Sequence, residues 1–156
     1  MKKIPFLLLV WVLFAGCKEE LEEPATEAFI FGRWNLTCEN NCIQVYKLDR
    51  GQLYIDNMNS FRESPTITYR PDPLSAEFAR LAEDLKSTFP DAYLRPRGLD
   101  FIACPACQEN GGYYLAFDRD TEILWWQIGN IPEIWPEEIR PFMQKLEATM
   151  AKLPAQ

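Results

Sequence analysis

Short stretches of apolar and β-branched residues, separated by turn residues, follow one another after position 28 and are typical of β-strands. The predicted strands cover residues 28–38, 42–48, 53–58, 99–104, 112–117 and 122–128, and 66–70 adds a further short strand. Gly51 closes a three-residue hairpin loop, 49–51, because glycine readily takes the left-handed backbone that such a loop needs. Residues 118–121 predict a second hairpin turn.

Apolar residues at helical spacing predict two helices. Asp72 is suited to cap the first helix and Pro73 to occupy its first turn, and Pro90 ends it. The apolar face of this helix comprises Leu74, Phe78, Leu81 and Leu85, with Phe89 beyond them. The second helix extends over 137–153, and Pro141 indicates that its long part begins there, after a single turn. Its apolar face comprises Ile139, Phe142, Met143, Leu146, Met150 and Leu153.

The order of these elements is strands, helix, strands, helix, and short hairpin-like links join most of the strands. This order predicts an α+β fold, with an antiparallel sheet of about six strands and two helices packed on one face. Residues 28–156 are of the length of one domain, and no internal repeat divides them.

The first seventeen residues have the features of an export signal. Two lysines are followed by an apolar run over 4–15, which is too short to span a bilayer as a helix. The motif Leu13-Phe14-Ala15-Gly16-Cys17 resembles the lipobox that lipoprotein signal peptidase cuts, although Phe14 stands where the family favours leucine. It predicts a signal peptide over 1–16 and a lipidated Cys17 that anchors the chain in a lipid bilayer. The alternative is an ordinary secretory signal followed by an unrelated cysteine.

Residues 17–27 are acidic and have little to bury, so they predict a solvated tether. The sequence Lys18-Glu19-Glu20 directly after Cys17 also resembles the lipoprotein export signal of Bacteroidota, and a plain charged linker is the alternative. The resemblance implies a lipid anchor in the outer membrane, with the domain in the periplasm or exposed at the cell surface.

Charge and composition exclude several functions. The formal net charge is −7, and removal of Lys2 and Lys3 with the leader makes it −9. Such a chain repels phosphate backbones, so we expect no nucleic-acid partner. The sequence has no histidine, the residue most often used as general base and metal ligand. We therefore expect no catalytic residue, no cofactor and no bound metal.

Four cysteines remain after lipidation of Cys17. They form the pairs Cys38-x3-Cys42 and Cys104-Pro105-Ala106-Cys107. Outside the cytoplasm they are expected to form disulfides, and we favour pairing within each motif over crossed connectivities. Two alternatives stay open: four thiolates on one zinc ion, and a thiol–disulfide redox pair of Cys104 and Cys107.

Aromatic residues of the last hairpin are candidates for binding. Trp125 and Trp126 are neighbours on a predicted strand, so their side chains point to opposite faces. One packs under the helices, and the other, with Tyr113 or Tyr114 across the hairpin, could form an exposed aromatic patch. The alternative is a sheet that is buried on both faces. The acidic residues around 118–122 also allow a weak calcium site, but we favour a solvated turn.

The order Cys38-x3-Cys42, Cys104-Pro105-Ala106-Cys107 and then Gly111-Gly112-Tyr113-Tyr114 resembles small lipoproteins of Bacteroidota, over most of the chain after the tether. The resemblance implies an envelope location and a single-domain fold, and it brings no activity with it. The sequence as a whole predicts a membrane-anchored, non-enzymatic binding module for an envelope protein or glycan. A thiol–disulfide redox protein that uses Cys104 and Cys107 is the alternative.

Overall fold

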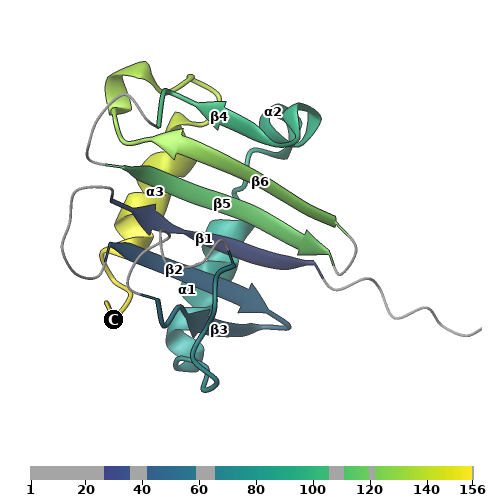
Figure 1. Ribbon diagram of the computed structural model, residues 1–156, viewed down its shortest axis with the longest axis vertical. Coiled ribbons are helices and arrows are strands. Elements are labelled where there is room, and N and C mark those ends of the chain that lie inside the picture. The colour runs from purple at the N-terminus through teal and green to yellow at the C-terminus, as the bar shows by residue number, and fades with distance from the viewer. Residues whose placement is uncertain (1–26, 36–41, 59–65, 106–110, 120–121, 156) are drawn as a thin grey trace, which may run out of the picture.

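The structure, a computed structural model, describes residues 27–35, 42–58, 66–105, 111–119 and 122–155. The predicted signal peptide, Cys17, Cys38 and Cys107 lie outside these ranges. The described residues form a six-stranded sheet in the order β3-β2-β1-β5-β6-β4, which confirms the predicted α+β class (Figure 1). The strands are β1 (Ala28–Trp34), β2 (Ile43–Asp49), β3 (Gln52–Ile55), β4 (Asp100–Ile102), β5 (Gly112–Arg119) and β6 (Glu122–Gly129).

The sheet is mostly antiparallel, as predicted, and departs from this at one edge. Strand β4 lies parallel to β6, with Asp100 opposite Trp126 and Ile102 opposite Ile128. Because β6 lies between β4 and β5, the chain that leaves β4 has to pass the end of β6 before it enters β5. An apolar pattern identifies a strand but not its neighbour, so the sequence did not reveal this crossover.

The first hairpin has a tighter turn than expected. Asp49 pairs with Gln52, which leaves Arg50 and Gly51 as a two-residue turn instead of a three-residue loop. Both central residues have positive φ, 49° and 74°, as the type I′ turn requires.

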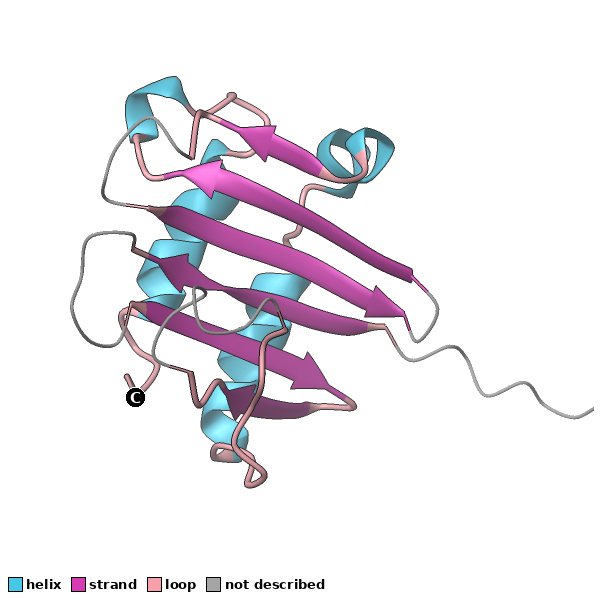
Figure 2. Ribbon diagram, viewed as in Figure 1, coloured by secondary structure: helices cyan, strands magenta, loops and turns pink. Residues whose placement is uncertain are grey.

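Two helices cover one face of the sheet and lie behind it in Figures 1 and 2: α1 (Ala76–Lys86) and α3 (Arg140–Met150). The short helix α2 (Asp91–Leu94) and the 3₁₀ turns η1 (Arg95–Arg97) and η2 (Pro132–Ile134) complete the helical segments of the described chain. Within these ranges, no helix combines the length and the apolar character needed to cross a bilayer.

Helix α1 begins later than predicted, at Ala76 after Ser75, and not at Asp72. The backbone N–H of Leu74 donates to the carbonyl of Leu53 in β3, 2.7 Å away, which keeps the preceding residues extended along the sheet. For α3 the prediction is confirmed, because Pro141 lies in its first turn and a single turn at 136–139 precedes it.

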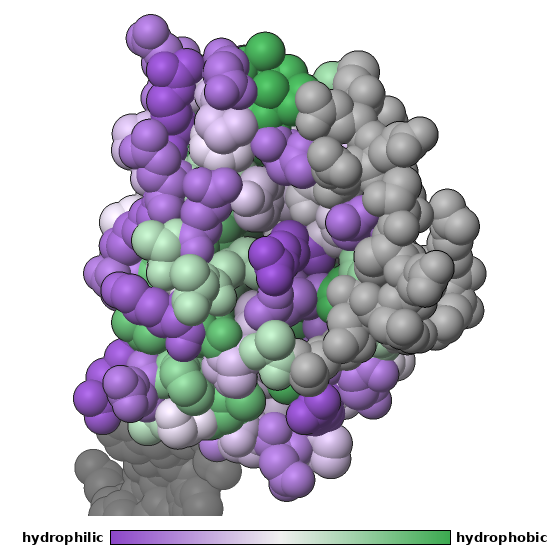
Figure 3. Space-filling model, turned by 90° about the vertical axis from the view of Figure 1, so that its left-hand side faces the viewer, coloured by the Kyte–Doolittle hydropathy of each residue, from purple (hydrophilic) through white to green (hydrophobic). Residues whose placement is uncertain are grey.

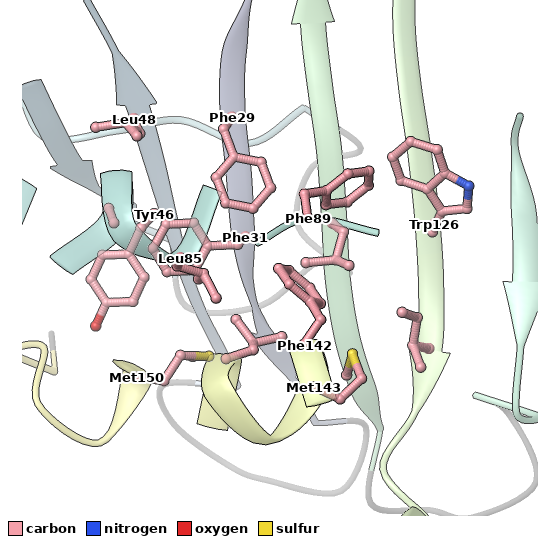
Figure 4. Close-up of a cluster of buried hydrophobic side chains, with 14 of the residues drawn as sticks. Phe29, Phe31, Tyr46, Leu48, Leu85, Phe89, Trp126, Phe142, Met143 and Met150 are labelled. Atoms are coloured by element: carbon pink, nitrogen blue, oxygen red, sulfur yellow. The ribbon is translucent and has the colours of Figure 1, made fainter. Parts of the chain in front are cut away.

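Aromatic side chains fill the core between the sheet and the helices (Figure 4). Phe89, which follows α1, lies at the centre. Its ring centroid is 4.7 Å from that of Phe117, 5.4 Å from Trp126 and 5.5 Å from Phe142. Edge-to-face contacts of this kind stabilise beyond the area that they bury. The ring of Phe89 therefore connects the segment after α1 to β5, β6 and α3.

Buried indoles also fix the irregular segments. Trp126 Nε1 donates to the carbonyl of Leu94, 3.2 Å away, and Trp135 Nε1 donates to the carbonyl of Gly129, 2.6 Å away. These bonds hold α2 and the segment after η2 against β6, and they satisfy polar groups that would otherwise be buried without partners.

The surface of the described residues is mixed. On the side of the molecule shown in Figure 3, hydrophilic and hydrophobic residues intermingle. The large apolar side chains that are exposed are Leu99, Phe101, Ile123 and Ile134. Of these, Phe101 packs edge-on against Trp125, with ring centroids 5.3 Å apart, on the face of the sheet that α1 and α3 leave open.

Candidate binding site

The open face of the sheet is partly covered by an irregular segment, residues 56–58 and 66–70, which we call the strap. It lies on the viewer's side of the sheet in Figure 1. Met58, Ile67 and Tyr69 of the strap pack on a small apolar cluster that includes Val45 and Ala116. The strap therefore gives the open face a second, smaller core.

A buried carboxylate holds the strap in place. Asp56 is fully buried, and its Oδ2 accepts from the backbone N–H of Val45 at 2.7 Å. Its Oδ1 accepts from the N–H of Met58 at 3.0 Å, and its backbone forms a bridge with Tyr69. These hydrogen bonds and the backbone bridge connect both described parts of the strap to β2.

A pocket of about 480 Å³ lies between the strap and strands β1, β2, β5 and β6. We call it the strap pocket. Its aromatic lining comprises Tyr69, Tyr114 and Trp125, and its aliphatic lining comprises Ile30, Ile67 and Ile123. Its polar lining comprises Lys47, Thr66, Asp118 and Gln127. Apolar surface with a few convergent polar groups is the usual character of a small-molecule site, and the volume lies within the usual range.

The aromatic lining comes from three elements. Tyr69 belongs to the strap, Tyr114 to β5 and Trp125 to β6. Burial raises the pKa of Tyr114 to about 12, with a further contribution from the Asp118 carboxylate. Burial raises the pKa of Tyr69 further still, so both phenols are neutral near physiological pH.

The hydroxyl of Tyr69 is enclosed, and no described residue forms a hydrogen bond with it. An enclosed hydroxyl without a partner is unfavourable by roughly 1–3 kcal/mol.

The charged lining is balanced. Lys47 Nζ on β2 lies 3.5 Å from Asp118 Oδ2 on β5 and reaches it across β1. Both side chains are about one quarter to one third exposed. One cation and one anion in contact leave this end of the pocket close to neutral, with donors and acceptors still available to solvent or a ligand.

The structure separates the four predicted binding residues into two pairs. Tyr114 and Trp125 line the strap pocket. Trp126 is fully buried in the core, and the Tyr113 hydroxyl on the helix side donates to Glu147 Oε1 at 2.6 Å. This separation follows from strand geometry, because alternate residues of a strand point to opposite faces.

Sequence reasoning missed Tyr69, Lys47, Asp118 and Gln127. Gln127 lies two residues after Trp125, and Asp118 lies four residues after Tyr114, so period-two alternation from the predicted aromatic residues points to both. No such signal exists for Tyr69, since its position depends on how the strap folds back over the sheet.

The cysteines lie at one end of the sheet. Cys42 comes just before β2, and Cys104 comes two residues after β4. Neither is a free thiol, because each has a partner that is not among the described residues. Three strands separate β2 from β4, so at about 4.8 Å per step these two strands lie roughly 19 Å apart. This separation argues against a bond between Cys42 and Cys104, and the local pairs Cys38–Cys42 and Cys104–Cys107 stay predictions.

Metal ligands do not gather in the described part of the chain: it contains no group of three or more His, Cys, Asp or Glu side chains placed to hold an ion. In the acidic hairpin, Asp118 pairs with Lys47, and Asp120 lies outside the described residues.

Comparison of this chain with protein-family models and with curated proteins gives no match, so the resemblance to small Bacteroidota lipoproteins that its motifs suggest stays a prediction.

Proposed function

We propose that this protein is a lipid-anchored, non-enzymatic binding module of the cell envelope, and that its ligand enters the strap pocket. One observation carries the proposal: a pocket of about 480 Å³ on the open face of the sheet combines three aromatic side chains with four polar ones. The strands of the sheet form the floor of the pocket, and the strap forms one of its sides.

The lipobox supports attachment to a membrane. Nine residues lie between the acylation site, Cys17, and Glu27 at the start of the folded domain, which makes ten residue steps. An extended chain of that length spans at most about 33 Å, so the domain would stay close to the bilayer and still turn freely. Arg95 and Arg119 hold Glu27, which fixes the point where the tether joins the domain.

The chemistry of the pocket supports binding over catalysis. Its charged groups, Lys47 and Asp118, pair with each other. The raised pKa values of Tyr69 and Tyr114 keep their phenols protonated near neutral pH, as hydrogen-bond donors and not as bases. Neutral donors and aromatic faces orient a ligand but do not transfer protons readily.

The test is co-sedimentation of the full-length protein with delipidated envelope fragments of its host. We expect wild-type protein to sediment with the fragments, and Trp125→Ala and Tyr114→Ala to reduce the bound fraction several-fold. Ile134→Ala is the matched control, because Ile134 is an exposed apolar residue of η2 that does not line the pocket. Equal binding by all four proteins would overturn the proposed site.

Attachment is tested separately. Labelled fatty acid should be incorporated into the wild-type protein in its host, and Cys17→Ser should abolish both the label and the membrane fractionation. Labelling that persists in the Cys17→Ser variant would overturn the assigned anchor.

A thiol–disulfide redox role for Cys104 and Cys107 is the second candidate. It is favoured by the left-handed backbone of Ala103 and Cys104, with φ of 53° and 49°, because strained non-glycine residues concentrate at functional sites. Thiol alkylation followed by intact-mass measurement tests it. Two thiols released by mild reductant would support a redox role, and thiols that stay protected would exclude it.

A further inference from the structure

We propose that the strap pocket binds a neutral saccharide, and this assignment rests on the binding role proposed above. A pyranose ring has C–H groups on its faces and hydroxyl groups around its edge. The lining of the pocket has the complementary chemistry, with aromatic rings and hydrogen-bonding groups of both kinds. The class of ligand follows from the chemistry of the pocket lining and not from the fold.

The aromatic side of the pocket suits the apolar faces of a sugar. Trp125 and Tyr114 come from adjacent antiparallel strands, with Trp125 opposite Ala116 and Tyr114 opposite Gln127 in the register. Both side chains are half-buried, so part of each remains open to a ligand. Phe101 packs edge-on against Trp125, at 5.3 Å between ring centroids, and restrains the indole. A restrained aromatic ring loses little conformational entropy when a ligand packs on it.

The polar side of the pocket suits the hydroxyl groups. The Gln127 amide and the Thr66 hydroxyl each donate and accept, as a sugar hydroxyl does. Lys47 adds donors, and Asp118 adds acceptors. Hydrogen bonds of this kind confer specificity, because a ligand without hydroxyl groups would leave them unmade.

Other ligand classes fit less well. A charged ligand gains little, because the Lys47–Asp118 pair neutralises this end of the pocket, and the acidic chain as a whole repels polyanions. A lipid chain would desolvate the polar side without pairing it. An extended peptide docks on the free main chain of a sheet edge, whereas the floor strands β1, β2, β5 and β6 each pair with a neighbour on both sides.

The experiment is saturation-transfer NMR on the full-length protein in an uncharged polyoxyethylene detergent, since a glycoside detergent would compete for the pocket. The probes are neutral oligosaccharides of glucose, mannose, galactose and N-acetylglucosamine, with oligogalacturonate as the anionic arm. We expect at least one neutral series to bind and the anionic arm not to bind. Trp125→Ala and Gln127→Ala should each weaken that binding by about tenfold or more, and Ile134→Ala should leave it unchanged.

Gln127→Ala removes only a half-buried amide, so it tests the pocket even if Trp125→Ala impairs folding. Absence of binding by every neutral series, or binding that neither pocket variant weakens, overturns the saccharide assignment. If sedimentation with the envelope still depends on Trp125 in that case, the binding role stands and only the ligand class falls. If it does not depend on Trp125, both proposals fall.

Discussion

Arg95 donates hydrogen bonds to both carboxylate oxygens of Glu27, from Nη1 to Oε1 at 2.9 Å and from Nη2 to Oε2 at 3.1 Å. Its guanidinium carbon lies 4.4 Å from the centroid of the Phe117 ring, so the cation also packs on the core. Arg119 Nε donates to the same Oε1 at 2.7 Å. The first described residue of the domain is thus joined to η1 and β5, far from it in sequence.

The ion pairs of Glu27 with Arg95 and Arg119 predict a loss of stability at acid pH. Burial alone would raise the pKa of Glu27, but the hydrogen bonds from Arg95 and Arg119 outweigh burial and hold it below the ordinary 4.5. Its contribution to folding is therefore present above the unfolded-state pKa and is lost as pH falls through the folded-state pKa. We expect Glu27→Gln to lower the free energy of unfolding by about 1 kcal/mol at neutral pH.

Urea denaturation at successively lower pH measures this effect. The difference between wild type and Glu27→Gln should shrink as the pH falls below 4.5, because protonation removes the same charge. Glu83→Gln is the matched control, since Glu83 is exposed on α1 and forms no ion pair within the described ranges. A constant difference at every pH would show that the charge of Glu27 is not involved.

The central position of Phe89 predicts a large effect of its removal. Phe89→Ala would leave a cavity bordered by Phe117, Trp126 and Phe142, and we expect a loss of about 3–5 kcal/mol in the free energy of unfolding. Phe101→Ala is the control, because Phe101 is 64% exposed and its loss should change stability by less than about 0.5 kcal/mol. Similar losses for the two variants in urea titrations would contradict the packing described for Phe89.

Parts of this fold follow from local chemistry and could be predicted. Pro141 marks the start of α3 because its ring is tolerated only in the first turn of a helix. Asp72 misled the prediction of α1, because the hydrogen bond between Leu74 and Leu53 comes from a distant strand. The same distinction holds for the pocket. Strand alternation placed Tyr114 and Trp125 among the candidates, whereas the contribution of Tyr69 depends on tertiary contacts of the strap.

Close approach of the backbone that follows β4 makes Gly129, in β6, sensitive to substitution. A Cβ at this position would lie 1.9 Å from the carbonyl oxygen of Ala103, a backbone atom that cannot move alone. We expect Gly129→Ala to displace the end of β4 and to lower the free energy of unfolding by roughly 1–3 kcal/mol. Loss of amide protection from hydrogen exchange should be concentrated in β4.

Gly51→Ala separates this steric effect from backbone strain. Gly51 has φ of 74° but no atom within 4 Å of a built Cβ, so its substitution tests the left-handed conformation alone. We expect a loss of about 1 kcal/mol for Gly51→Ala, without effect on the exchange of β4. If β4 also loses protection from hydrogen exchange in Gly51→Ala, its loss of protection in Gly129→Ala does not result from the clash with Ala103.

The separation of Cys42 from Cys104 predicts which disulfide-linked peptides can form. Proteolysis of the full-length protein without reduction should release no peptide that joins these two residues, because three strands lie between β2 and β4, the strands that they flank. We expect Cys38 to pair with Cys42 and Cys104 with Cys107, each bond lying within a single peptide whose mass increases on reduction. A Cys38–Cys104 link would overturn the local pairing, and a Cys42–Cys104 link would contradict the strand order itself.

Buried phenols predict a loss of stability at alkaline pH. Burial raises the pKa of Tyr46 to about 12 and that of Tyr114 to about 12, and it also raises the pKa of Tyr69 and Tyr113. A tyrosine whose folded-state pKa lies above the unfolded-state value near 10 contributes stability that is complete below pH 10. This stability is lost as the pH rises from 10 through the folded-state pKa, because the unfolded chain releases its protons first.

Tyr46→Phe isolates one of these contributions. The Tyr46 hydroxyl donates to the carbonyl of Pro154 at 2.7 Å, so we expect the variant to be less stable by about 1 kcal/mol at neutral pH. Because phenylalanine does not ionise, the stability of the variant should fall less steeply than that of wild type above pH 10. Urea titrations at several pH values, with tyrosinate absorbance recorded in parallel, measure both effects. Tyr54→Phe controls for the loss of a phenol, since the Tyr54 hydroxyl is exposed on β3. Parallel curves for wild type and Tyr46→Phe above pH 10 would contradict the burial of an un-ionised Tyr46 beneath the C-terminal segment.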